Sequence, residues 1–143
     1  MMTEEQIVLV KKTWRLLRDV DPVLVGNVFY SRLFLIDPSL RSLFKSPMEA
    51  QYTKLMATLS LIVARLDRLD QLTADIAALA QRHAGYGVKP QHYETVGKAL
   101  LWMLQQGLGR DWNPTVEEAW KQCYTLLSQT MLQSLNPSQS VRT

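Results

Sequence analysis

Residues 81–88 read QRHAGYGV, and this stretch places a histidine, His83, at the end of a predicted helix. Leu79 lies four residues earlier on the same apolar face. Gly85 and Gly87 follow, and glycine is the residue that most readily ends a helix and turns the chain. Taken alone, such a histidine is more often structural or partly exposed than a metal ligand. Its role therefore depends on the other segments of the chain.

Helix signals continue on both sides of this stretch. Apolar residues recur three and four positions apart, and no segment alternates with period two. Capping residues precede proline in Asp21-Pro22, Asp37-Pro38, Ser46-Pro47 and Asn113-Pro114, and each pair predicts a helix start. Two further pairs have the capping-box spacing, Thr3 with Gln6 and Ser46 with Glu49. We predict an all-α fold with helices near 4–20, 22–36, 38–44, 47–68, 72–84, 91–107 and 114–134.

Length and composition predict one soluble domain. The 143 residues are 47% apolar and 20% charged, with a net charge of +3 that is too small to indicate nucleic-acid binding. The amino terminus does not resemble a secretory signal, and no apolar stretch is long enough to span a bilayer. We expect a cytoplasmic protein with its domain over 1–136 and a frayed tail over 137–143.

Few catalytic or metal motifs are compatible with this sequence. It has two histidines and one cysteine, and it has no Gly-rich phosphate loop, HExxH, CxxC or serine elbow. Cys123 shares the apolar face of the last predicted helix with Val116 and Trp120, which favours a small buried side chain over a reactive thiol. The candidate chemistry therefore centres on the histidines.

An ordered series of residues along the chain matches one family. The members of the series are Trp14, Phe29-Tyr30, Leu33-Phe34, Asp37-Pro38, Phe44, Gln51, His83, His92-Tyr93, Trp120 and Tyr124. Over about residues 3–135 the chain resembles the globin family, in particular single-domain bacterial haemoglobins and the haem domain of flavohaemoglobins. The resemblance implies a globin fold of about seven helices packed around one haem pocket.

The resemblance also implies a cofactor site. His83 would be the axial iron ligand of a haem b, which is held without covalent bonds because no Cys-x-x-Cys-His motif occurs. Tyr93 would orient the His83 imidazole. The apolar walls of the pocket would come from Phe44, Leu55, Leu79, Val88 and Val96.

On the opposite face of the haem, the resemblance implies a tyrosine and a glutamine. Tyr30 and Gln51 would both donate hydrogen bonds to bound dioxygen, which carries more negative charge than carbon monoxide. Taken alone, Tyr30 would be a core tyrosine and Gln51 a solvent-facing residue. No histidine occupies the distal position, so we expect a five-coordinate ferrous haem that binds dioxygen reversibly.

One departure bears on enzymatic activity. Leu135 stands where flavohaemoglobins have a glutamate that acts on the proximal histidine through a tyrosine, and the chain stops where a reductase domain would begin. An oxygen-binding protein, monomeric or weakly dimeric, is therefore favoured. The alternatives are a nitric oxide dioxygenase or weak peroxidase that works with a separate reductase, and a haem-free interaction or sensor module. Nitric oxide and carbon monoxide are the other expected ligands.

Overall fold

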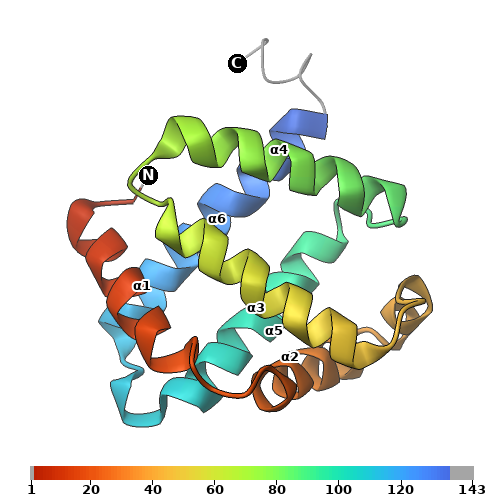
Figure 1. The fold of residues 1–143 in the computed structure, drawn as a ribbon, viewed down its shortest axis with the longest axis horizontal. Coiled ribbons are helices and arrows are strands. Elements are labelled where there is room, and N and C mark those ends of the chain that lie inside the picture. The colour runs from red at the N-terminus through yellow and green to blue at the C-terminus, as the bar shows by residue number, and fades with distance from the viewer. Residues whose placement is uncertain (1, 136–143) are drawn as a thin grey trace.

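The computed structural model describes residues 2–135, and all of its regular structure is helical (Figure 1). This confirms the predicted all-α class; the tail predicted over 137–143 lies outside the described residues. No helix within that range is long and apolar enough to cross a membrane. The elements are α1 (Glu4–Leu17), α2 (Pro22–Ile36), the 3-10 helix η1 (Pro38–Leu43), α3 (Met48–Ala64), α4 (Leu69–Gly85), α5 (His92–Leu108), the 3-10 helix η2 (Gly109–Asp111) and α6 (Pro114–Leu135).

Most of the predicted helix starts are confirmed by side-chain caps. The Asp21 carboxylate accepts from the Val23 backbone N–H at 2.9 Å, and Asp37 caps η1 in the same way. Asn113 Oδ1 accepts from the Val116 N–H at 3.0 Å. The capping box at the start of α1 is also present. These caps satisfy amide groups that have no partner within their own helix.

The predicted start at Ser46 is wrong. The residue that precedes α3 is Pro47, and no side chain caps this helix, so the capping box between Ser46 and Glu49 is not formed. Three other boundaries differ by more than one residue: α1 ends at Leu17, α3 ends at Ala64, and α4 begins at Leu69, each earlier than predicted. Between α1 and α2, Asp21 is extended (ψ 122°) because the α conformation is disfavoured directly before a proline.

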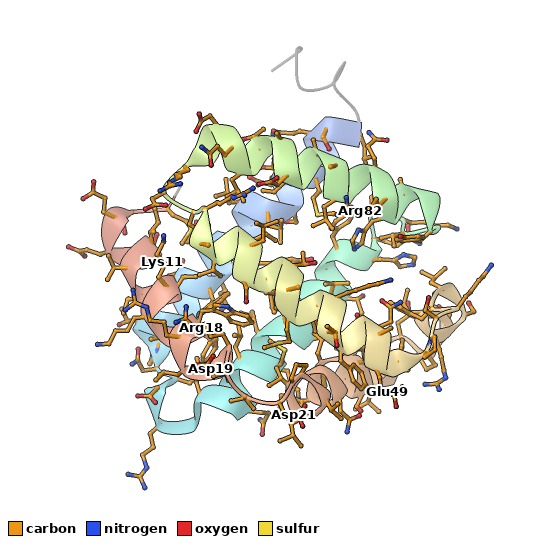
Figure 2. The ribbon with its side chains drawn as sticks, viewed as in Figure 1. Lys11, Arg18, Asp19, Asp21, Glu49 and Arg82 are labelled. Carbon is orange, nitrogen blue, oxygen red and sulfur yellow. The ribbon has the colours of Figure 1, made fainter. Side chains whose placement is uncertain are left out.

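The core joins the two ends of the described chain. The indole rings of Trp14 in α1 and Trp120 in α6 meet edge to face, with centroids 6.1 Å apart. Trp120 Nε1 donates to the buried hydroxyl of Thr13 at 2.9 Å, so the polar atoms inside this contact are satisfied. Lys11, labelled in Figure 2, adds a surface link to the turn after α3, with Nζ 3.2 Å from Asp67 Oδ1.

A glycine sets the distance between α2 and α3. Figure 1 shows these helices crossing, and they are in direct contact. A Cβ atom built on Gly26 would lie 2.6 Å from Cβ of Tyr52, closer than side-chain carbons approach in proteins. Because Cβ of Tyr52 is fixed by the backbone of α3, a larger residue at this position would force the helices apart. The close crossing brings Tyr52 against the next turn of α2, where Tyr30 lies.

We predict that Gly26→Ala lowers the free energy of unfolding by about 1–3 kcal/mol, because overpacking at a rigid crossing strains both backbones. The measurement is urea unfolding of both proteins in the same cofactor state. Gly85→Ala is the matched control, since a Cβ there meets nothing within 4 Å. It should leave the stability unchanged or raise it by up to about 1 kcal/mol. If Gly26→Ala behaved like this control, the described crossing would be wrong.

Candidate functional site

The turn after α4 is held in the geometry that glycine favours at a helix end. Gly87 has a φ of 90°, in the left-handed region. Its N–H donates to the Ala84 carbonyl at 3.1 Å, and the Val88 N–H donates to the His83 carbonyl at 3.1 Å. This pair of bonds is the Schellman arrangement. It fixes Val88 relative to the last turn of the helix, where His83 lies.

The His83 ring has one nitrogen engaged and one available. Nδ1 lies 2.9 Å from the Leu79 carbonyl oxygen. Because a carbonyl oxygen can only accept, Nδ1 carries the proton and Nε2 is the basic nitrogen. Burial lowers the pKa of His83 below its ordinary 6.5, against a smaller opposing effect of the Leu79 bond. The imidazole is therefore neutral at pH 7, the form that binds metals.

Half-buried apolar side chains make up the predicted pocket walls. They come from the end of η1 and from α3, α4, α5 and the turn before α5, and each packs against the core while keeping part of its surface exposed. The end of η1 also meets the turn after α4, since a Cβ on Gly87 would lie 3.5 Å from Leu43. The residues are Phe44, Leu55, Leu79, Val88 and Val96. Their exposed parts are apolar surface that a flat apolar group could cover.

Tyr93 does not orient His83 through a hydrogen bond in this structure. The Nδ1 proton of His83 goes to the Leu79 carbonyl, and the Tyr93 hydroxyl is buried without a partner among the described residues. The backbone of Tyr93 does form a hydrogen bond between helices, because its carbonyl accepts from the Tyr124 hydroxyl of α6. Burial raises the pKa of Tyr93, so the phenol keeps its proton. A buried hydroxyl without a partner is uncommon in folded proteins.

Tyr30 lies at the centre of an aromatic cluster. It is 7% exposed, with ring centroids 5.3 Å from Phe44 and 5.7 Å from Tyr52. Burial, with a smaller effect of Tyr52, raises the pKa of Tyr30 to about 12, so its hydroxyl is a donor at neutral pH. None of the hydrogen bonds described between residues 2 and 135 involves that hydroxyl. The phenol therefore still has a proton to donate.

Gln51 lies half-buried in the first turns of α3, directly before Tyr52. Tyr30 packs against this same part of α3, so the two predicted donors are brought to one region. They are not joined by a hydrogen bond in the described chain. The ring contact between Tyr30 and Phe44 connects the aromatic cluster to the predicted pocket wall.

Sequence reasoning missed part of this aromatic cluster. Tyr52 was not a candidate, although its ring contacts Tyr30 and its backbone limits the α2–α3 crossing. Phe34 completes the cluster, 6.0 Å from Tyr30. The available signal was spacing, since Tyr30 and Phe34 are four residues apart on one helix face. Cys123 is buried as predicted, and burial raises its pKa to about 12.

Comparison with known proteins relates most of the chain to globins. The family model described as Globin matches residues 27–131. Neuroglobin-1 of Oncorhynchus mykiss is 31% identical over 91% of this chain and 90% of its own length. A flavohemoprotein of Vibrio cholerae is also 31% identical, over 92% of this chain. The chain spans 34% of that protein's length, so the comparison concerns only about a third of the flavohemoprotein.

Solved structures share the fold. An engineered carbene transferase, made from a provisionally named nitric oxide dioxygenase of Rhodothermus marinus, superposes with a TM-score of 0.83 and 26% identity over the full length of both chains. A hexacoordinated haem protein from an anhydrobiotic tardigrade superposes with a TM-score of 0.82 over 93% of this chain and 94% of its own. Its 18% identity supports similarity of fold alone.

The lowered pKa of His83 predicts a pH dependence of stability. With a pKa near 6.5 when unfolded and a lower one when folded, the unfolded chain binds more protons between these values. Stability should be level above pH 6.5 and fall as the pH decreases through this window, by at most about 1.4 kcal/mol per pH unit.

Urea unfolding of the cofactor-free chain across this window measures the effect. His83→Gln should remove the slope, whereas the matched variant His92→Gln should keep it. The His92 ring is engaged differently, because its Nδ1 accepts from the Lys89 N–H at 3.0 Å. An unchanged slope in His83→Gln would mean that the His83 ring is not buried as described.

Proposed function

Because this chain belongs to the globin family, we propose that it is a haem protein that reversibly binds dioxygen and other diatomic ligands. Globin and flavohemoprotein relatives imply haem binding. The observation that carries the proposal is the His83 ring, which is neutral, held at Nδ1 by the Leu79 carbonyl, and free at Nε2. One imidazole with a fixed tautomer is the donor that globins present to haem iron.

The residues present fit a haem b held without covalent attachment. When bound, the haem supplies an iron atom with one position for an imidazole and one for a diatomic ligand. His83 would provide the imidazole, and the half-buried wall residues would cover the ring faces by area and dispersion. The unpartnered hydroxyl of Tyr93 would gain an acceptor within this pocket. Before the cofactor is added, His83 has an unused nitrogen lone pair, the Tyr93 hydroxyl has no partner among the described residues, and the wall residues keep exposed apolar surface.

Two side chains would hold the diatomic ligand. The Tyr30 hydroxyl keeps its proton at neutral pH and has no competing acceptor among the described residues. The Gln51 amide is a second donor in the same region of the fold. Both would stabilise a ligand that carries negative charge and would discriminate for dioxygen over carbon monoxide.

A second candidate function is nitric oxide dioxygenase activity with electrons from a separate reductase. It is favoured by the flavohemoprotein relatives and by the name of the Rhodothermus marinus parent protein. Sustained consumption of nitric oxide on addition of a reductase would support this function. Consumption limited to one turnover per haem would support oxygen binding alone.

We predict that His83→Ala loses haem during purification and regains it when imidazole is added. His92→Ala should keep the wild-type absorbance spectrum. Its ring caps the turn before α5, so its removal should cost only about 0.5–2 kcal/mol of stability. The measurement is the haem-to-protein ratio from absorbance of the purified proteins. Equal haem loss in the two variants would mean that His83 is not the iron ligand.

We also predict that Tyr30→Phe speeds dioxygen release about ten- to a hundredfold. Loss of a hydrogen bond to a partly charged acceptor costs about 1.5–3 kcal/mol, and about 1.4 kcal/mol corresponds to a factor of ten. Carbon monoxide release should change much less. Stopped-flow dissociation of both gases measures the difference.

Gln51→Leu should change dioxygen release in the same direction as Tyr30→Phe. If the two side chains also bond each other when a ligand is present, the double variant should be non-additive. Unchanged release in Tyr30→Phe would show that Tyr30 only packs within the aromatic cluster. The haem proposal would then stand on His83, without the distal pair.

A further inference from the structure

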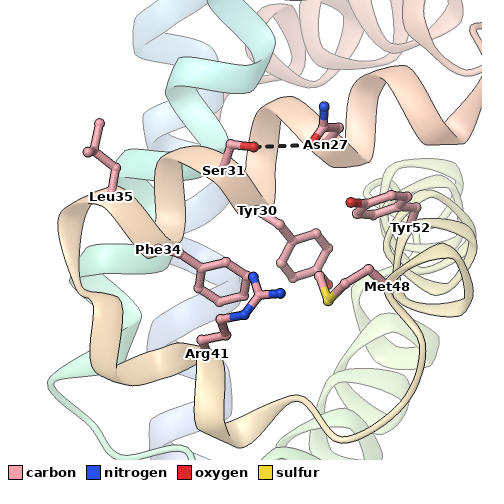
Figure 3. Close-up of a pocket in the computed structure, with 8 residues that line it drawn as sticks. All are labelled: Asn27, Tyr30, Ser31, Phe34, Leu35, Arg41, Met48 and Tyr52. Atoms are coloured by element: carbon pink, nitrogen blue, oxygen red, sulfur yellow. Dashed lines mark hydrogen bonds between the residues drawn. The ribbon is translucent and has the colours of Figure 1, made fainter.

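A hollow lies on the outer side of α2, where that helix faces η1 and the start of α3 (Figure 3). Its volume is about 450 Å³, within the range of sites that take small organic molecules. It is distinct from the His83 side of the fold, since none of its lining residues comes from α4 or α5. Tyr30 is the one candidate site residue that also lines it.

The inner wall of this hollow is aromatic and apolar. The ring centroid of Tyr30 lies 6.0 Å from that of Phe34 and 5.7 Å from that of Tyr52. The Met48 side chain extends beside the Tyr30 ring, as Figure 3 shows. Leu35 on the rim is 70% exposed and adds apolar surface to the edge of the hollow. A flat apolar molecule could stack here at little entropic cost.

A positively charged side chain, that of Arg41, lies over the aromatic wall of the hollow. Figure 3 shows the Arg41 guanidinium reaching across the Phe34 ring toward Tyr30, and its central carbon lies 5.5 Å from the Phe34 ring centroid. Arg41 forms no ion pair with any residue in the described range. None of the residues that line the hollow is acidic. Asn27 adds an amide whose oxygen accepts from Ser31, so its N–H groups are left to donate.

We propose that this hollow is a binding site for a small carboxylate with a flat apolar body. The carboxylate would pair with the Arg41 guanidinium, whose fork of N–H groups suits two oxygens. The apolar body would lie against Tyr52 and Phe34. This site goes beyond oxygen binding, because Arg41, Phe34 and Tyr52 are not among the residues assigned to the haem or to its diatomic ligand.

The combination of groups selects this ligand class over simpler ones. An inorganic anion would use Arg41 and leave the aromatic wall uncovered. A neutral apolar molecule would use the wall and leave the guanidinium without a partner. Only a molecule with both parts uses the whole site, so charge and apolar body should contribute jointly to affinity.

The first experiment is isothermal titration of the purified full chain with 2-naphthoate, and with 2-naphthalenemethanol as the matched neutral molecule. We expect saturable binding of the carboxylate and at least fivefold weaker binding of the alcohol. Binding should weaken as salt is added, because the Arg41 side chain is exposed. Absence of saturable carboxylate binding, or equal affinity for both molecules, would overturn the proposal.

The second experiment locates the bound molecule. The chain has six methionines, and Met48 is the one that lines the hollow. In a protein labelled at the methionine methyl groups, the ring current of 2-naphthoate should shift the Met48 resonance most. Binding that leaves Met48 unshifted would place the ligand elsewhere and would overturn the proposal.

The third experiment compares two arginines of the same region. Arg41→Gln should weaken 2-naphthoate binding about five- to thirtyfold, which corresponds to loss of one charge-assisted contact. Arg32→Gln is the matched control, since the Arg32 guanidinium lies 4.1 Å from the Trp102 ring centroid and outside the hollow. It should bind 2-naphthoate as the wild type does. Equal effects of the two substitutions would overturn the role of Arg41.

Discussion

The hydrogen bond from His83 Nδ1 to the Leu79 carbonyl is the constraint on which the candidate site depends. It assigns the proton to one ring nitrogen and leaves the other basic, while burial keeps the ring neutral. The bond spans one helical turn, so α4 must remain helical as far as His83. The Schellman turn at Gly87 then ends the helix at Gly85, two residues after His83. Helix, ring orientation and turn are therefore parts of one local arrangement.

A second constraint acts from the other side of the fold. The absence of a side chain at Gly26 lets α2 and α3 approach closely, and Tyr52 fills the contact. That approach places Tyr30 inside an aromatic cluster, with its hydroxyl protonated and not bonded to a described residue. One face of this cluster continues to Phe44 and the predicted pocket wall, and another lines the hollow beside Arg41. Packing between two helices thus serves two different surfaces.

The sequence predicted the helices well because their starts depend on local chemistry. Asp21, Asp37 and Asn113 cap neighbouring amides, and such contacts need only a few residues. The N-cap predicted at Ser46 is wrong because Pro47 occupies the capping position of α3. Tyr52 was missed since its importance arises from a contact with Gly26 that is distant in sequence. For the same reason, the Tyr93 hydroxyl could not be placed by spacing, because its environment is set by packing between helices.

The proposed function requires that His83 alone binds haem iron from the protein, with the opposite position open to a diatomic ligand. Absorbance and resonance Raman spectra of the reduced, ligand-free protein at neutral pH test it most directly. We expect a five-coordinate, high-spin ferrous haem with an iron–histidine stretching band that is absent from His83→Ala supplied with no imidazole. A six-coordinate, low-spin ferrous spectrum would overturn this assignment, because it would require a second protein ligand to the iron.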